Sequence, residues 1–154
     1  MAKLVVIVVL FSLAGIAAAA DFSIQIANPL AAQTYHMKSS AFVFRAVGCE
    51  SPAQPEVSAS AEGLVLGQRR TVAVKVQAAQ APGVFGIFRQ WPDEGVWIVH
   101  LSGRCGPKSA SVLVATDAKG FLRDSSIFLT RPAMESDIQA ALKAPRKKPD
   151  SAHD

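Results

Sequence analysis

Short segments in which hydrophobic and polar residues alternate recur along the chain after residue 20. Arg70–Gln77 is the clearest, because Val72, Val74 and Val76 fall on one side and polar or small residues on the other. A period of two is typical of a strand that buries one face. The sequence therefore predicts seven or eight strands, drawn from Phe22–Ile26, Ala41–Val47, Val57–Ala61, Arg70–Gln77, Gly83–Gln90, Val96–Ser102, Ser111–Thr116 and Ser126–Thr130.

Turn residues separate these strands at close intervals. Trp91–Gly95 contains proline and glycine, and its length suits a long hairpin loop between Gly83–Gln90 and Val96–Ser102. Asp117–Gly120 predicts a second turn. Strands this short and this closely spaced predict an antiparallel β-sandwich in residues 21–132.

The pattern becomes helical after Pro132. Residues 133–143 carry acidic side chains early and Lys143 at the end, an order that the helix dipole favours. We therefore expect a short amphipathic helix whose apolar face comprises Met134, Ile138, Ala141 and Leu142. Residues 144–154 offer little to bury, so a disordered basic tail is expected there.

Residues 1–20 have the layout of a cleavable secretory signal. Lys3 precedes the apolar run Leu4–Ile16, which is followed by small residues that end at Ala20. The expected cleavage site lies between Ala20 and Asp21. The alternative is an uncleaved membrane anchor, for which the run Leu4–Ala20 is at the short limit. We therefore expect an exported protein, either periplasmic or extracellular.

Cys49 and Cys105 are the only cysteines in the chain. In an oxidising compartment two lone cysteines most often pair, and such a loop restricts the unfolded chain by about 4 kcal/mol. Two free buried thiols or a thiolate metal site are the alternatives. Thiol–disulfide redox catalysis has little support, because the chain contains no C-x-x-C motif.

The formal net charge is +4, and the basic residues are dispersed through most of the chain. Nucleic-acid binding needs a denser basic stripe, so no nucleic-acid partner is expected. One basic cluster lies near the C-terminus. We interpret it as a solvated tail or as a peripheral contact with an anionic membrane or cell wall, and it comprises Lys143, Arg146, Lys147 and Lys148.

A motif within residues 82–99 resembles a known family. Pro82–Phe85, then Trp91-Pro92, then Gly95–Val99 is similar to the strand–turn–strand motif of small exported bacterial domains of the YtkA/FixH-like type. Together with the strand and helix patterns above, the resemblance implies an all-β fold: an immunoglobulin-like antiparallel β-sandwich of seven to eight strands with a short C-terminal helix. It also implies a link to respiratory-oxidase assembly and metal handling.

Enzymatic activity has little support in the sequence. The chain lacks a G-x-S-x-G elbow, and no histidine shows a spacing to an aspartate that suggests a catalytic triad. Asp93 and Glu94 are adjacent in a turn, where they favour turn formation and solubility. We therefore predict that the protein is not an enzyme.

Copper binding is the sharper chemical hypothesis. His36 and Met37 place an imidazole beside a thioether, and both groups are copper ligands. Together with His100 they would form a metal site, which Cys49 and Cys105 could join only if reduced. The alternative is that Met37 simply fills a gap in the packing. No other cofactor is predicted.

Trp91 is the best sequence candidate for an exposed partner contact, because it lies in a predicted turn. Asp93 and Glu94 complete that contact, and the alternative is that Trp91 caps the sandwich. The sequence thus predicts an exported, non-catalytic accessory or interaction module of the bacterial envelope, whose partner is an unknown envelope protein or polymer. The alternative function is a periplasmic copper-binding or metal-handling protein.

Overall fold

The computed structural model describes residues 21–29, 37–50 and 54–146. The predicted signal sequence, His36 and residues 147–154 lie outside this described part. Within it the chain forms nine strands and one helix. These are β1 (Ser23–Ala27), β2 (Phe42–Val47), β3 (Glu56–Val65), β4 (Gln68–Val74), β5 (Val76–Ala78), β6 (Val84–Ile87), β7 (Val96–Cys105), β8 (Lys108–Asp117), β9 (Gly120–Leu129) and α1 (Glu135–Lys143).

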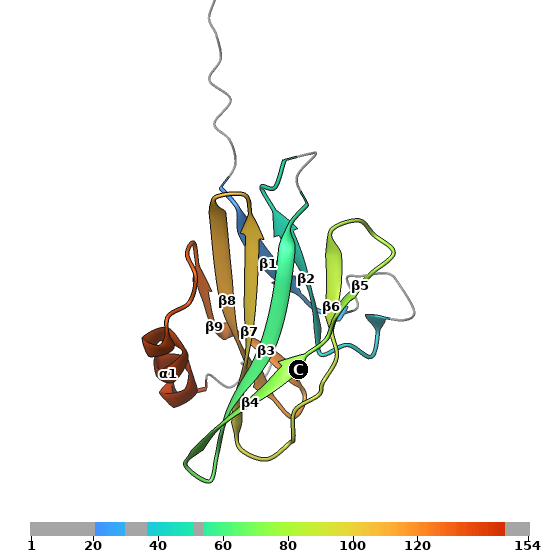
Figure 1. Ribbon diagram of the computed structural model, residues 1–154. Helices are drawn as coiled ribbons and strands as arrows, with labels where there is room; N and C mark the ends of the chain where they lie inside the picture. Colours follow the sequence, from blue (N-terminus) through green and yellow to red (C-terminus); the bar gives the residue numbers. More distant parts are fainter. Residues whose placement is uncertain (1–20, 30–36, 51–53, 147–154) are drawn as a thin grey trace, which may run out of the picture.

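The strands form two antiparallel sheets that pack against each other (Figure 1). Sheet A has four strands in the order β1-β2-β6-β5, and sheet B has five in the order β4-β3-β7-β8-β9. The predicted all-β sandwich with a short C-terminal helix is therefore confirmed. The described residues form nine strands rather than the predicted seven or eight.

The main core lies between the sheets. Phe42 and Phe44 project into it from β2, while Val43 between them faces outward. Alternate residues of β7, among them Val99 and Leu101, enter the same core from sheet B. This alternation is the period of two that the sequence shows.

One predicted strand is divided between the two sheets. β4 pairs with β3 in sheet B, and after Lys75 the chain continues as β5, which pairs with β6 in sheet A. The alternating pattern of Arg70–Gln77 runs through this change, because alternation reports which side chains are buried and not which strand lies alongside. One edge of the sandwich is therefore closed by continuous chain.

The predicted hairpin around Trp91–Gly95 is wrong. β6 belongs to sheet A and β7 to sheet B, so the connection crosses from one sheet to the other. Trp91 is 4% exposed and packs in the core at this crossing. The guanidinium of Arg89 donates a 2.9 Å hydrogen bond to the backbone carbonyl of Asp117, which fixes the connection against the β8–β9 turn.

The predicted disulfide between Cys49 and Cys105 is confirmed. Cys49 follows β2 of sheet A, Cys105 ends β7 of sheet B, and their Cα atoms are 5.7 Å apart. The covalent bond therefore links the two sheets across the core. A disulfide in this position fits an oxidising environment.

Helix α1 covers part of the outer face of sheet B (Figure 1). Ile138 and Leu142 pack against Ile98 of β7 and Leu113 of β8, which lie on the face of sheet B opposite to the main core. These contacts form a second, smaller core. Among the described residues, no helix is long and apolar enough to span a membrane.

The ends of α1 differ from the sequence prediction in two ways. Met134, which the sequence placed on the apolar face, precedes the helix as its N-cap and is 55% exposed; its backbone N–H donates to the carboxylate of Asp137. Arg146 is half-buried, and its guanidinium donates a 3.2 Å hydrogen bond to the backbone carbonyl of Trp97. Residues 144–146 follow the helix without forming a further element, and the rest of the predicted tail lies outside the described residues.

Replacing both Cys49 and Cys105 by serine is expected to lower the free energy of unfolding by about 4 kcal/mol, since the bond restricts the unfolded chain. Urea denaturation of the oxidised parent and the double variant measures this difference. The reduced parent is the control, and it should match the double variant. Equal urea midpoints for the oxidised parent and the double variant would contradict the prediction.

Candidate functional site

The structure separates two of the predicted copper ligands. Met37 is 4% exposed and packs with Val43 and Val84 on the outer face of sheet A. His100 lies on the outer face of sheet B, one residue from core-facing Val99. Side chains on opposite outer faces of a sandwich cannot bind one ion, so the predicted pairing of Met37 with His100 is wrong.

His36 lies outside the described residues. Within the described ranges, no group of three or more histidine, cysteine, aspartate or glutamate side chains is placed to hold a metal ion. Cys49 and Cys105 form the disulfide, so they offer no thiolate. Met37 fills the packing role that the sequence left open as its alternative.

The predicted partner contact at Trp91 is wrong. Its indole is buried in the core, and the guanidinium of Arg89 lies 5.5 Å from the ring centroid. Trp91 thus caps the sandwich, the alternative reading of the sequence. Asp93 is exposed and pairs with Arg89 at 2.9 Å, and Glu94 is exposed.

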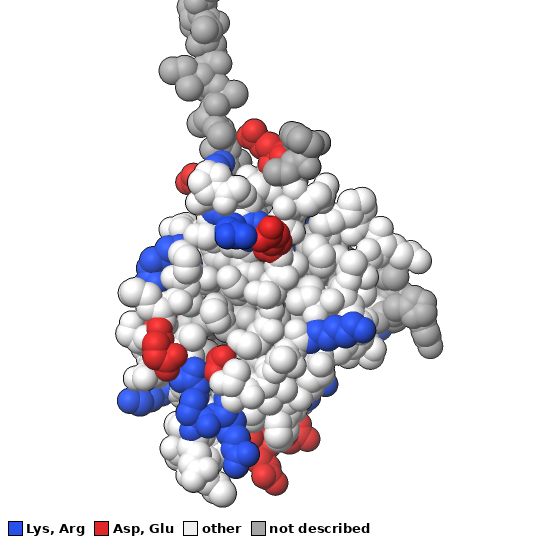
Figure 2. Space-filling view, viewed as in Figure 1, with Lys and Arg blue, Asp and Glu red and all other residues white. Residues whose placement is uncertain are grey.

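The basic residues of the predicted C-terminal cluster are only partly described. Lys143 ends α1 and is exposed, whereas Arg146 is half-buried against the backbone of β7. Lys147 and Lys148 lie outside the described residues. Figure 2 shows that Lys and Arg side chains gather together with acidic ones near α1 and the β3–β4 hairpin. Contact of this cluster with an anionic surface stays a prediction.

Sequence reasoning missed a buried carboxylate on the outer face of sheet B. Glu62 is 6% exposed, and its carboxylate accepts hydrogen bonds from Ser60 at 2.9 Å and Thr71 at 2.7 Å. The guanidinium of Arg69 donates to the same carboxylate at 2.9 Å and also pairs with Glu135 of α1 at 2.8 Å. This network therefore ties the β3–β4 hairpin to the helix.

Burial alone would raise the pKa of Glu62. Hydrogen bonds from Thr71, Arg69 and Ser60 and the charge of Arg69 outweigh burial, so the pKa is lowered from 4.5. Glu62 is therefore an anion held by its neighbours and has no spare proton to give. The predicted strand Val57–Ala61 ends one residue before Glu62, which explains why the sequence pattern did not reveal it.

His100 lies beside this network. It pairs in register with Ser60 on β3, and its Nε2 atom is buried without a hydrogen-bond partner. Burial lowers the pKa of His100 below 6.5, although the negative charge of Glu62 acts in the opposite direction. Burial therefore favours the neutral form of the His100 imidazole.

A second feature lies at the edge of the sandwich where the edge strand of sheet A, β1, comes next to the edge strand of sheet B, β9. We call the space between these two strands the seam. β1 packs over β8, so β9 extends one strand beyond sheet A. As a result Phe128, which lies opposite core-facing Val112, is 48% exposed although it points toward the core side.

A bulge in β9 shapes the middle of the seam. Leu113 pairs with Ile127, but Ala115 pairs with Leu122, so residues 123–126 bulge out of the regular ladder. The hydroxyl of Ser126 accepts from the backbone N–H of Ala115 and holds the bulge in place. The sequence pattern could not show the bulge, because the alternation of β9 breaks there.

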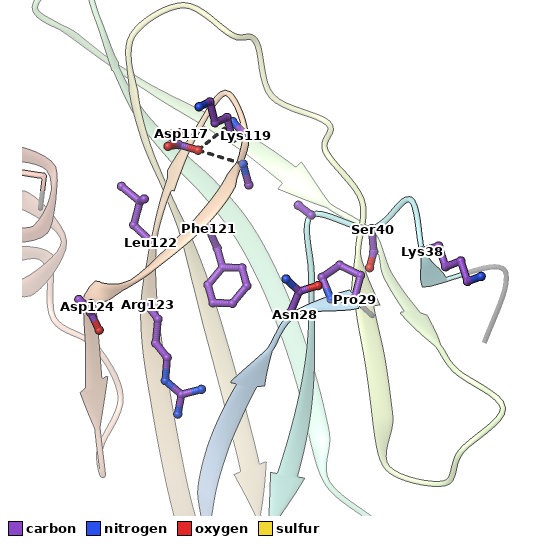
Figure 3. A pocket seen from close by; sticks show the side chains of 12 residues that line it. Asn28, Pro29, Lys38, Ser40, Asp117, Lys119, Phe121, Leu122, Arg123 and Asp124 are labelled. Atoms are coloured by element: carbon purple, nitrogen blue, oxygen red, sulfur yellow. Dashed lines mark hydrogen bonds between the residues drawn. The ribbon is translucent and has the colours of Figure 1, made fainter. Parts of the chain in front are cut away.

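Arg123 of this bulge crosses the seam. Its guanidinium donates a 3.1 Å hydrogen bond to the backbone carbonyl of Ile26 in β1. One hollow of about 500 Å³ lies on one side of Arg123, among Asn28, Ser40, Lys119 and Phe121 (Figure 3). A second hollow of about 940 Å³ begins at Arg123 and Phe128, follows β1 and continues onto the outer face of sheet A, where Arg45 and Val84 line it.

The residues around the seam combine several kinds of group that take part in recognition. Backbone of an edge strand, two aromatic side chains and guanidinium groups can recognise a polar, extended ligand. His100 and Glu62, the groups with pKa values shifted by burial and hydrogen bonding, lie on the far face of sheet B. The seam is therefore the better candidate functional site.

No family model, curated protein or solved structure matches this chain. The resemblance to the YtkA/FixH-like type stays a prediction from residues 82–99.

Glu62→Gln is expected to lower the free energy of unfolding by about 2 kcal/mol, because the substitution removes the buried ion pair with Arg69, which keeps only Glu135 as a partner, and disturbs the hydrogen bonds from Ser60 and Thr71. Glu56→Gln is the matched control. Glu56 pairs with Arg104 on the surface at 2.7 Å, so its loss should cost less than about 0.5 kcal/mol. Urea denaturation measures both, and equal effects would contradict the assignment.

His100 should make the protein less stable in mild acid. Its pKa is lowered in the folded state, so below 6.5 the unfolded chain binds more protons and stability falls as the pH falls. The urea midpoint should drop between about pH 7.5 and 5.5, before Glu62 begins to titrate. The drop should shrink in His100→Gln; an identical drop in parent and variant would show that other groups cause it.

Proposed function

We propose that this chain is an exported, non-catalytic interaction module that binds an extended segment of another envelope protein in the seam. The observation that carries the proposal is Phe128: an aromatic side chain on the core side of its sheet that stands half exposed over a hollow of about 940 Å³. Single exposed apolar residues are common, but Phe128 lines this hollow together with residues of the edge strand β1.

The distribution of ionisable groups supports binding rather than catalysis. In the seam, the carboxylate of Asp117 accepts the backbone N–H groups of Lys119 and Gly120 and so shapes the turn. The Arg123 guanidinium is engaged with a carbonyl. These groups hold the backbone around the seam in place, and a fixed strand edge suits recognition of an extended polypeptide.

The disulfide and the N-terminal sequence support an exported location. Cys49–Cys105 links the two sheets, and disulfides persist in oxidising compartments. Lys3 followed by Leu4–Ile16 has the composition of a secretory signal. An extracytoplasmic interaction module is consistent with both features.

The proposal predicts that peptides of about twelve residues, selected by display on the folded protein, bind with Kd below about 100 µM. Phe128→Ser should weaken this binding by about tenfold, since about half of the Phe128 side chain remains to be buried. Leu66→Ser is the matched control, because Leu66 is 99% exposed at the tip of the β3–β4 hairpin.

Fluorescence anisotropy of labelled peptides measures these affinities. Binding that is insensitive to Phe128→Ser, or equally sensitive to Leu66→Ser, would place the contact elsewhere and overturn the proposal. Failure to select any peptide would overturn it as well.

A further inference from the structure

We infer that the partner segment binds as an added strand: an extended peptide with a carboxylate side chain pairs with the open edge of β1, opposite β9. This inference rests on the proposed function and names the form of its ligand. Within the described residues, sheet A has no strand opposite β9, and the seam occupies that position.

The edge of β1 presents backbone groups in a known direction. In an antiparallel pair, alternate residues direct both N–H and C=O toward the partner strand, and the residues between them direct both groups away. The carbonyl of Ile26 points to Arg123 and so away from β2. The backbone N–H and C=O groups of Ile24, two residues earlier, must therefore also point away from β2.

A strand added beside β1 would lie over the core-side face of β9. Phe121 packs with Phe42 at a centroid distance of 5.7 Å, Arg123 reaches across the seam, and Phe128 stands half exposed. β1 has five residues, so its edge is about 17 Å long and matches a peptide of similar length. An added strand would cover Phe128 and continue sheet A over β9.

Arg123 explains how the free edge is protected and why the ligand is acidic. Its guanidinium donates a hydrogen bond to the carbonyl of Ile26, so this carbonyl is not open to another strand. Charged side chains and bulges commonly block pairing at a sheet edge in this way. An incoming peptide N–H would take over that carbonyl. The guanidinium would then be free to bind a carboxylate of the peptide, which is the partner that it fits best.

The charges around the two hollows favour the same ligand. The lining residues include four basic side chains and two acidic ones: Lys38, Arg45, Lys119 and Arg123 against Asp117 and Asp124. A second copy of this chain, paired edge to edge through β1, would bring Arg45 and Arg123 toward their own copies. Repulsion between these like charges disfavours pairing of two copies, whereas the same charges attract an acidic peptide.

The experiment uses the selected peptide of highest affinity and amide hydrogen exchange of the full folded chain, followed by NMR. The expected result is that the peptide slows exchange at the amides of Ile24 and Ile26 by at least about tenfold. The amide of Leu66 at the exposed hairpin tip is the internal control and should not change.

A double-mutant cycle tests the carboxylate. Arg123→Gln should weaken binding by about tenfold, and so should changing the peptide's acidic residue to its amide. The two changes together should cost no more than either alone. Arg104→Gln, which removes one positive charge from a surface pair with Glu56, is the matched control for net charge and should leave affinity unchanged.

The outcomes separate this inference from the proposed function. Peptide binding that depends on Phe128 but leaves Ile24 and Ile26 unprotected would keep the proposed function and overturn strand addition. Protection of both amides without peptide would show that the chain itself or a second copy fills the position, and sedimentation would tell these apart; either result overturns the inference. Additive effects in the cycle would overturn the role of Arg123.

Discussion

Sheet B has one more strand than sheet A, and both sheets close the same core. At one edge the chain passes from β4 to β5, so the two sheets end together there. At the other edge, β9 is the additional strand of sheet B and extends beyond β1, the edge strand of sheet A. The exposure of Phe128, the bulge at residues 123–126 and the reach of Arg123 to Ile26 all follow from this unequal width.

The outer faces of the two sheets bury different amounts of apolar surface. Sheet B carries apolar Ile98 and Leu113 outward, and α1 covers them, with the Arg69–Glu135 pair fixing the helix to the hairpin. Among the described residues, the outer face of sheet A carries a smaller apolar cluster, in which Met37 packs with Val43 and Val84. The helix therefore completes the hydrophobic burial of the wider sheet, and the segment at Met37 contributes to burial on the narrower one.

The strands and the disulfide were predictable because alternation and paired cysteines are local or compositional signals. The neighbours of each strand were not: Arg70–Gln77 alternates without interruption yet serves two sheets, and Trp91–Gly95 has hairpin chemistry yet crosses the core. Alternation records burial, whereas sheet membership depends on contacts between residues far apart in sequence. The seam escaped prediction for the same reason, since Arg123 and Ile26 are 97 residues apart.

The passage of the chain at Lys75 has a mechanical consequence. Because β4 and β5 are consecutive, the chain itself joins the two sheets along one edge. The Cys49–Cys105 bond joins the sheets covalently at a second point. Any loosening between the two sheets would widen the opposite edge, where the guanidinium of Arg123 bridges from β9 to the backbone of β1. The β1–β9 side is therefore an edge at which a hydrogen bond, rather than the chain itself, joins the two sheets.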